Sequence, residues 1–297
     1  MIKMIKFFLL LGLSLILNAA QIEKELLYNK YTLKDQYSYG KKSTRQFQWE
    51  KINTYLDKLE DFEKTYPTLG FVANYKNING SPALINGETI DSDGVPRNQA
   101  IPLYNPNNLS TPAKYGRDGS LVAIISRYEQ FSLIKSFSRD GEWMVPNRYL
   151  DEISSNDFNK AIFIDRKNQN IVTMDKINET WKVRSMNPVT TGRNHPPFSA
   201  PTPLGTYIVQ EKKYKMLYLK DGSSDIIEGY SPYAVRFTRG AYMHGIPVNL
   251  PRTEMIEYSP LLGTEPRSHM CVRNATSHAK FIYDWSRINQ TLVFVID

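Results

Sequence analysis

One cysteine and four histidines are the residues of this chain best suited to chemistry, and all five lie in its last third. Cys271 is the only cysteine in 297 residues. A thiol with an ordinary pKa of about 8.5 is only a few per cent ionised at neutral pH, so a cysteine nucleophile needs a base. That base must be near in the fold rather than in the sequence. The candidates are His195, His244, His269 and His278.

The residues that follow Cys271 favour an acyl-transfer site. Asn274 and Ser277 are typical helix-capping residues, so a helix is expected to begin just after the cysteine. Backbone N–H groups and the positive end of a helix dipole stabilise both a thiolate and a developing oxyanion. A single cysteine excludes an internal disulfide, so the thiol is either a small buried residue or a reactive group.

The order of motifs around these residues resembles the L,D-transpeptidase catalytic domain of the YkuD type. The family's signature is a His-Gly pair followed, after a spacer, by Ser/Thr-His-Gly-Cys, an aliphatic residue and Arg. This chain has His244-Gly245 and then the run from Ser268 to Arg273. Further matches lie at 190–192, 200–207 and 233–237, and the resemblance covers the chain from about residue 160 onward.

The resemblance implies a role for the main residues of the motif. Cys271 is the expected nucleophile, His244 the general base and then acid, and the Gly245 carbonyl the group that orients the His244 ring. The backbone amides of Met270 and Cys271 are expected to hold the oxyanion. Arg273 is expected to position a substrate carboxylate or the loop itself, with simple pairing to a surface carboxylate as the alternative.

The other residues of the motif and the other histidines have less specific assignments. Ser268 and His269 belong to the same oxyanion and substrate-binding turn, where His269 is expected to make a structural hydrogen bond that shapes the turn. His278 is expected to be a partly exposed helix residue. His195 is expected to be a loop residue, with a place along the substrate cleft as the alternative.

Two features depart from the family pattern. Met270 stands where the family has glycine, which is acceptable if the backbone there does not need a positive φ. The interval between His244 and Cys271 is longer than the family's usual spacer. The additional residues are expected within 249–267, as a loop over the cleft. The longer segment 246–267 is rich in apolar residues and proline, which predicts an ordered lid.

The implied reaction is cleavage of the bond between meso-diaminopimelate and D-alanine in a tetrapeptide stem of peptidoglycan, through a thioester on Cys271 and without a cofactor. Transfer to an amine makes a 3-3 cross-link, whereas transfer to water makes the enzyme an L,D-carboxypeptidase. A metal hydrolase with His244, His269 and Cys271 as ligands is an alternative, although the spacing of the last two is unusual for zinc. A non-catalytic wall-binding protein is another.

Short apolar runs with turn residues between them predict a mostly β structure. The expected strands are at 121–125, 131–134, 142–145, 161–164, 171–174, 181–184, 205–209, 233–237 and 292–296. Three- and four-residue spacing of apolar residues predicts two helices, over 43–64 and near 275–288. Ser43 and Gln46 have the spacing of a capping box for the first helix.

These elements and the resemblance together predict a mainly β, α+β fold. An L,D-transpeptidase-type β-sandwich catalytic domain is expected at 158–297. Residues 113–155 resemble a small bacterial SH3-like β-barrel, and residues 21–112 are expected to be an N-terminal helical and irregular region.

The first twenty residues have the pattern of a secretory signal peptide. Lys3 and Lys6 precede an apolar run, residues 7–17, and Ala19 and Ala20 follow it. That run is shorter than the roughly 20 apolar residues that span a bilayer. The expected location is therefore the periplasm, with membrane contact only during export.

The charge of the chain gives little support to a nucleic-acid partner. The 37 basic residues are interspersed with 30 acidic ones, for a net charge of +7, which is typical of a solvated, mildly basic surface. The short basic cluster Lys212, Lys213 and Lys215 lacks a nucleic-acid motif. The expected partners are peptidoglycan stem peptides.

Overall fold

Strands are the main regular structure of this protein, with 44% of the described residues in strands and 12% in helices. The computed structural model describes residues 20–39, 43–154 and 158–297. The expected signal peptide therefore lies outside the described residues, except for Ala20. Within the described part of the chain, no helix has the length and apolar character needed to cross a membrane.

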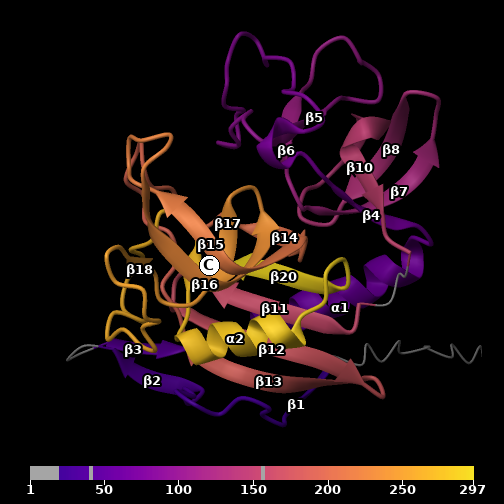
Figure 1. Cartoon of the computed structure of the whole chain (residues 1–297). Coiled ribbons are helices and arrows are strands. Elements are labelled where there is room, and N and C mark those ends of the chain that lie inside the picture. The colour runs from indigo at the N-terminus through magenta and orange to yellow at the C-terminus, as the bar shows by residue number, and fades with distance from the viewer. Residues whose placement is uncertain (1–19, 40–42, 155–157) are drawn as a thin grey trace, which may run out of the picture.

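A six-stranded sheet forms the centre of the C-terminal half (Figure 1). Its order is β1 (Gln21–Lys24), β13 (Thr180–Pro188), β12 (Asn170–Ile177), β11 (Lys160–Asp165), β20 (Thr291–Ile296) and β14 (Gly205–Ile208). Side chains alternate across a strand, so a strand covered on both faces is apolar throughout. This explains the uninterrupted apolar sequence of β20, in which Phe294 and Val295 pack into different cores.

A second sheet packs over one face of the first and gives the expected sandwich. It contains β15 (Glu211–Leu219), β16 (Ile227–Thr238), β17 (Ala241–His244) and β19 (Val272–Arg273), while β18 (Val248–Asn249) pairs with β16. The core between the two sheets includes Ile162, Ile164, Tyr207, Val235, Phe237, Met243, Val272, Val293 and Val295.

Helix α1 (Trp49–Thr65) covers the opposite face of the six-stranded sheet. Its buried residues, Ile52, Leu56, Leu59 and Phe62, have the three- and four-residue spacing on which the helix was predicted, while Trp49 at its start is partly buried. The predicted start at residue 43 and the capping box were wrong. Residues Ser43–Gln46 form strand β3, paired with β2 (Gln36–Tyr39), because the apolar stripe that stabilises the helix begins only after them.

Helix α2 (Thr276–Trp285) begins at the expected place but is capped differently. The sequence suggested Asn274 and Ser277 as caps, but neither side chain caps the helix. Instead the carbonyl oxygen of Glu257 accepts the Thr276 N–H at 2.8 Å, and the Glu257 carboxylate accepts the Ser277 N–H at 3.1 Å. The long segment before Cys271 therefore provides the cap.

The upstream strands form a separate antiparallel sheet at the other end of the molecule (Figure 1). Its order is β10 (Leu150–Glu152), β4 (Leu69–Val72), β7 (Leu121–Arg127), β8 (Phe131–Ser136) and β9 (Glu142–Pro146). The other elements here are β5 (Ala100–Leu103) paired with β6 (Lys114–Arg117), and the short 3-10 helices η1 (Tyr75–Asn77) and η2 (Asn147–Tyr149).

The expected strands within 113–155 are present, but the sheet also includes β4 from before that range. Among the described residues the sheet is open, with β10 and β9 at its edges. The SH3-like barrel and the domain boundaries stay predictions.

Candidate active site

Two short strands bring Cys271 and His244 together. Strands β17 and β19 pair in parallel, with Met243 opposite Val272 and His244 opposite Arg273. The carbonyl of His244 also accepts the Asn274 N–H at 2.8 Å. Cys271 directly precedes β19, so the pairing places it beside the strand that ends in His244.

The two side chains line one cavity of about 160 Å³. The cavity lies beside the second sheet and is partly enclosed by the turn that contains Cys271. Its lining consists of Met216, Tyr218, Glu228, Ser231, His244, Pro247, Asn249, Ser268, His269, Cys271 and Arg273. This set includes the predicted residues Ser268, His269 and Arg273.

His244 is neutral at physiological pH and has the tautomer that a base requires. Its ring is 3% exposed, and burial lowers its pKa from 6.5 to about 4, with the Gly245 carbonyl acting in the opposite direction. Nδ1 lies 2.6 Å from that carbonyl oxygen, so Nδ1–H is the donor. Nε2 is therefore unprotonated and able to accept a proton.

The thiol of Cys271 is protonated in the resting protein. Burial raises its pKa, while the backbone N–H of Tyr242 and the charge of Arg273 oppose that rise. The thiol donates to the carbonyl of Gly240, with Sγ and O 3.6 Å apart. Because the thiol is neutral, its use as a nucleophile depends on a base such as His244.

The turn from Ser268 to Cys271 is held mainly through its carbonyl groups, which leaves amide N–H groups free. Thr202 Oγ1 donates to the Met270 carbonyl at 2.8 Å, and Ser268 Oγ donates to the Cys271 carbonyl. Within the described part of the chain, the N–H groups of Met270 and Cys271 have no hydrogen-bond partner in the protein. They are therefore available to an oxyanion.

Met270 fits this turn without backbone strain. It is not among the residues with positive φ, so the glycine usual in the family is not required for backbone conformation here. The residue that must be glycine is Gly192, because the backbone of Met270 packs closely against it. An added Cβ at Gly192 would lie 2.8 Å from Met270 Cα.

The charged groups of the cavity differ in sign. Arg273 Nε is buried and has no hydrogen-bond partner among the described residues. Glu228, from β16, lines the same cavity. A cleft with a guanidinium and a carboxylate suits a ligand with both a carboxylate and an ammonium group.

The remaining histidines have different surroundings. His269 is half-exposed, and its Nε2 lies 3.2 Å from Asp221 Oδ2, in the connection between β15 and β16. His195 exchanges backbone hydrogen bonds with Ser199 in a loop and does not line the cavity. In the described residues, no group of three His, Cys, Asp or Glu side chains has the arrangement of a metal site.

The expectation that His278 is partly exposed was wrong. Its side chain is fully buried, with Nδ1 3.0 Å from Asn274 Oδ1 and Nε2 2.8 Å from Ser185 Oγ. Ser185 lies on β13, far away in sequence, so no local pattern indicates this contact. Burial lowers the pKa of His278 to about 3.

We therefore expect His278→Ala to destabilise the fold by about 3 kcal/mol, since it leaves a cavity and removes the ring partner of the buried Asn274 Oδ1, while Ser185 Oγ keeps Thr173 Oγ1 at 2.7 Å. The unfolded chain binds a proton on this histidine below pH 6.5 and the folded chain does not, so the wild type loses stability as the pH falls from about 6.5 towards 3. The variant should lose this part of the slope. Urea denaturation across this pH range measures both effects, and a change below about 0.5 kcal/mol would indicate an exposed side chain.

The long segment at 246–267 contacts the start of α2 and contributes little to the lining of the cavity that contains the thiol. Only Pro247 and Asn249 of this segment line the cavity. Ile246 and Leu262 pack with Ala275 at the start of α2, and Glu257 caps that helix. The expected lid is thus largely a support for the elements that follow Cys271.

Several residues around the cavity were missed in the sequence. Met216 and Tyr218 come from β15, whose Lys- and Tyr-rich sequence was not recognised as a strand. The two-residue spacing of Met216 and Tyr218 is the signal that could have indicated them, because in a strand it puts both side chains on the same face of the sheet.

Comparison with known proteins shows that the residues of this cleft lie within a known type of domain. Residues 159–295 match the model of the L,D-transpeptidase catalytic domain, called YkuD. All the cavity-lining residues fall inside this range. No curated protein matches the chain.

Among solved structures, the chain is similar to an L,D-transpeptidase from Mycobacterium tuberculosis, with 18% identity over 63% of this chain and 70% of that one, and a TM-score of 0.37. An L,D-transpeptidase from Mycobacterium smegmatis has 16% identity, 59% and 82% coverage, and a TM-score of 0.37. A fused zinc-dependent amidase/peptidase/peptidoglycan-binding domain-containing protein from Clostridium acetobutylicum has 21% identity and a TM-score of 0.34. The match covers 49% of this chain and 54% of that protein.

Proposed function

Residues 159–295 belong to the L,D-transpeptidase catalytic-domain family, and from this premise we propose that the chain is a peptidoglycan L,D-transpeptidase with Cys271 as its nucleophile. One observation carries the proposal. A protonated thiol and a neutral histidine with a free Nε2 line one cavity, and the turn that contains the thiol has two unpaired backbone N–H groups. Acyl transfer through a thioester requires these three parts.

Each part has a step in the reaction. His244 Nε2 takes the proton from Cys271, and Sγ attacks the carbonyl carbon of meso-diaminopimelate in a tetrapeptide stem. The Met270 and Cys271 N–H groups hold the oxyanion. The imidazolium then gives its proton to the departing D-alanine amine, which leaves a thioester. An acceptor amine attacks the thioester, loses a proton to His244, and forms the 3-3 cross-link while the thiol is restored.

The charges of the cleft support a stem peptide as substrate. The meso-diaminopimelate side chain carries both an ammonium and a carboxylate group. Arg273, with its unpaired Nε, would bind a carboxylate, and Glu228 would bind an ammonium group. These contacts would hold the stem while the reacting carbonyl faces the thiol.

L,D-carboxypeptidase activity is the second candidate, and the position of the 246–267 segment favours it. Because only two residues of that segment line the cavity, little of it separates the thioester from water. Bulk water is about 55 M, so transpeptidation requires a bound acceptor that competes with it.

Mass spectrometry of the products distinguishes the two reactions. Purified enzyme is incubated with disaccharide-tetrapeptide, and we expect dimers with a 3-3 link. Tripeptide monomers alone, with acceptor in excess, would show that the enzyme trims stems. A disaccharide-tetrapeptide whose meso-diaminopimelate side-chain amine is acetylated is the control, since it can act as donor but not as acceptor, and a transpeptidase should then accumulate tripeptide by hydrolysis.

We place this reaction in the periplasm, on the basis of the signal-like residues 1–20. Cell fractionation with a periplasmic marker tests this location.

A further inference from the structure

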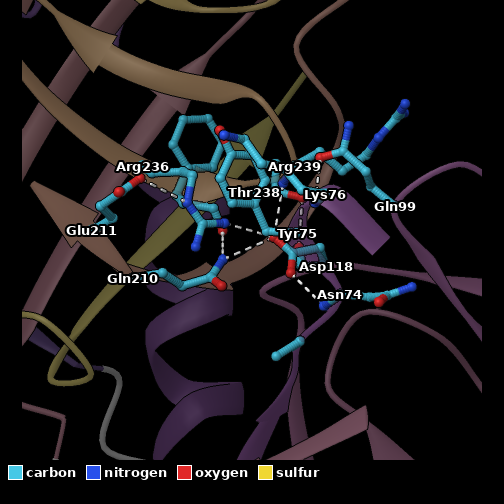
Figure 2. Close-up of polar contacts among 12 residues, drawn as sticks. Asn74, Tyr75, Lys76, Gln99, Asp118, Gln210, Glu211, Arg236, Thr238 and Arg239 are labelled. Carbon is cyan, nitrogen blue, oxygen red and sulfur yellow. Dashed lines mark hydrogen bonds and ion pairs between the residues drawn. The ribbon is translucent and has the colours of Figure 1, made fainter. Parts of the chain in front are cut away.

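Asp118, in a turn of the upstream part of the chain, makes polar contacts with residues of the catalytic domain (Figure 2). The turn, residues 117–120, joins β6 to β7. The carbonyl of Gly119 accepts the Ile208 N–H at 2.9 Å, and Ser120 forms a β-bridge with Tyr207. Gly119 has φ of +80°, and an added Cβ would lie 2.1 Å from the carbonyl oxygen of Phe237. The turn is thus fitted closely against β14 and β16.

Asp118 is fully buried at the tip of this turn and accepts hydrogen bonds from four groups. Its Oδ1 accepts the Asn74 N–H at 2.8 Å, from its own part of the chain. Its Oδ2 accepts Arg236 Nη1 at 2.9 Å, the Arg239 N–H at 2.9 Å and Gln210 Nε2 at 3.2 Å, all from the catalytic domain. One carboxylate therefore joins the two parts of the molecule.

The partners of Asp118 define the turn between β16 and β17. Besides the Arg239 N–H, the Thr238 hydroxyl donates to the Asp118 carbonyl at 2.6 Å. Arg239 has φ of +43°, in the left-handed region that a residue with a side chain seldom adopts. A backbone held in such a conformation depends on its surroundings, and here Asp118 accepts its N–H.

The same turn contacts the nucleophile. The carbonyl of Gly240, the next residue, accepts the Cys271 thiol, and the side chain of Met270 approaches Gly240, with Cε 3.7 Å from the position of an added Cβ. Strand β17 begins at Ala241 and ends at His244. The position of this turn therefore affects both the thiol and the base.

We infer that Asp118 is a positioning residue of the active site, and that the catalytic domain depends on the upstream turn 117–120 to hold Cys271 and His244 in register. The reaction that Asp118 would affect rests on the proposed function, whereas the contacts of Asp118 do not. Arg273 and Tyr218 line the substrate side of the cavity and do not bond to Asp118. Loss of the carboxylate should therefore slow the chemical step more than it weakens substrate binding.

Asp118→Asn tests the inference in the full-length chain. The amide keeps the shape of the side chain but removes its charge and leaves a donor facing other donors. We expect kcat on disaccharide-tetrapeptide to fall by about 10- to 100-fold with KM within about twofold, because small displacements of reacting groups have effects of this size. The rate at which iodoacetamide alkylates Cys271 should fall as well.

Asp91→Asn is the matched control. Asp91 is a buried carboxylate of the same upstream part, where it accepts the N–H groups of Asp93, Val95 and Tyr115. Its loss should lower stability without changing kcat or alkylation. Both variants are compared at a temperature where circular dichroism shows them folded. If Asp118→Asn does not fold, Thr238→Val replaces it, and at least a threefold drop in kcat is then expected.

The outcomes separate this inference from the proposed function. If the folded variant keeps kcat and alkylation within twofold of the wild type, Asp118 serves stability alone and the inference is wrong. If the wild type does not turn over stem peptides but Asp118→Asn still slows alkylation, the proposed function fails and the positioning role stands.

Discussion

Cys271→Ala is expected to reduce turnover of tetrapeptide stems by about 10⁴-fold or more, because it removes the proposed nucleophile, the only cysteine of the chain. The fold should change little. Cys271 is half-buried, and its replacement by alanine removes a single sulfur, for a loss of about 1 kcal/mol in the free energy of unfolding. Product analysis and urea denaturation of the same preparation measure both quantities.

A carbapenem provides a direct readout of the same thiol. The intact wild type should gain the mass of the drug on Cys271, and the alanine variant should gain none. A chelator should leave the wild-type activity unchanged. Activity lost with the chelator and restored by zinc would favour a metal hydrolase instead. If the native thiol takes no label and Cys271→Ala unfolds, the cysteine is structural.

Several strands of the catalytic domain were predictable because they carry a clear local signal. Residues 161–164 and 292–296 are unbroken apolar runs, and both became central strands of the first sheet. Strand β1 was missed, since Gln21–Lys24 is largely polar and is stabilised by parallel pairing with β13, which lies far along the chain. Pairing of that kind leaves no trace in a short window of sequence.

The contrast between local signals and contacts from distant segments also explains which site residues the sequence indicated. Cys271 and His244 were found because motif and chemistry coincide in them. Asp118 was not found, because its four hydrogen-bond donors come from distant segments and its neighbours Arg117 and Gly119 read as an ordinary turn. The apolar residues of 246–267 suggested a lid, although apolar side chains equally suit packing against α2.

His244→Ala is expected to lower kcat/KM by about 10² to 10⁴-fold, the usual contribution of a general base. The reason is specific to this site: burial raises the pKa of Cys271, so little thiolate exists without a base. His195→Ala is the matched control, since His195 is an exposed loop histidine outside the cavity, and it should retain wild-type activity. Similar losses in both variants would mean that the base is assigned wrongly.

The pH dependence gives the stronger test, because it reports the protonation state of the base itself. His244 accepts the thiol proton only when neutral, and its pKa is lowered to about 4, so wild-type kcat/KM should stay high well below pH 6.5 and fall only as the pH approaches 4. In His244→Ala this acidic limb should disappear. The residual activity should instead rise tenfold per pH unit up to the pKa of the thiol, in proportion to the thiolate fraction. Circular dichroism at each pH excludes unfolding as the cause. A wild-type limb near pH 6.5 would show that His244 is solvated in the working enzyme, and a limb that persists in His244→Ala would assign proton transfer to another group.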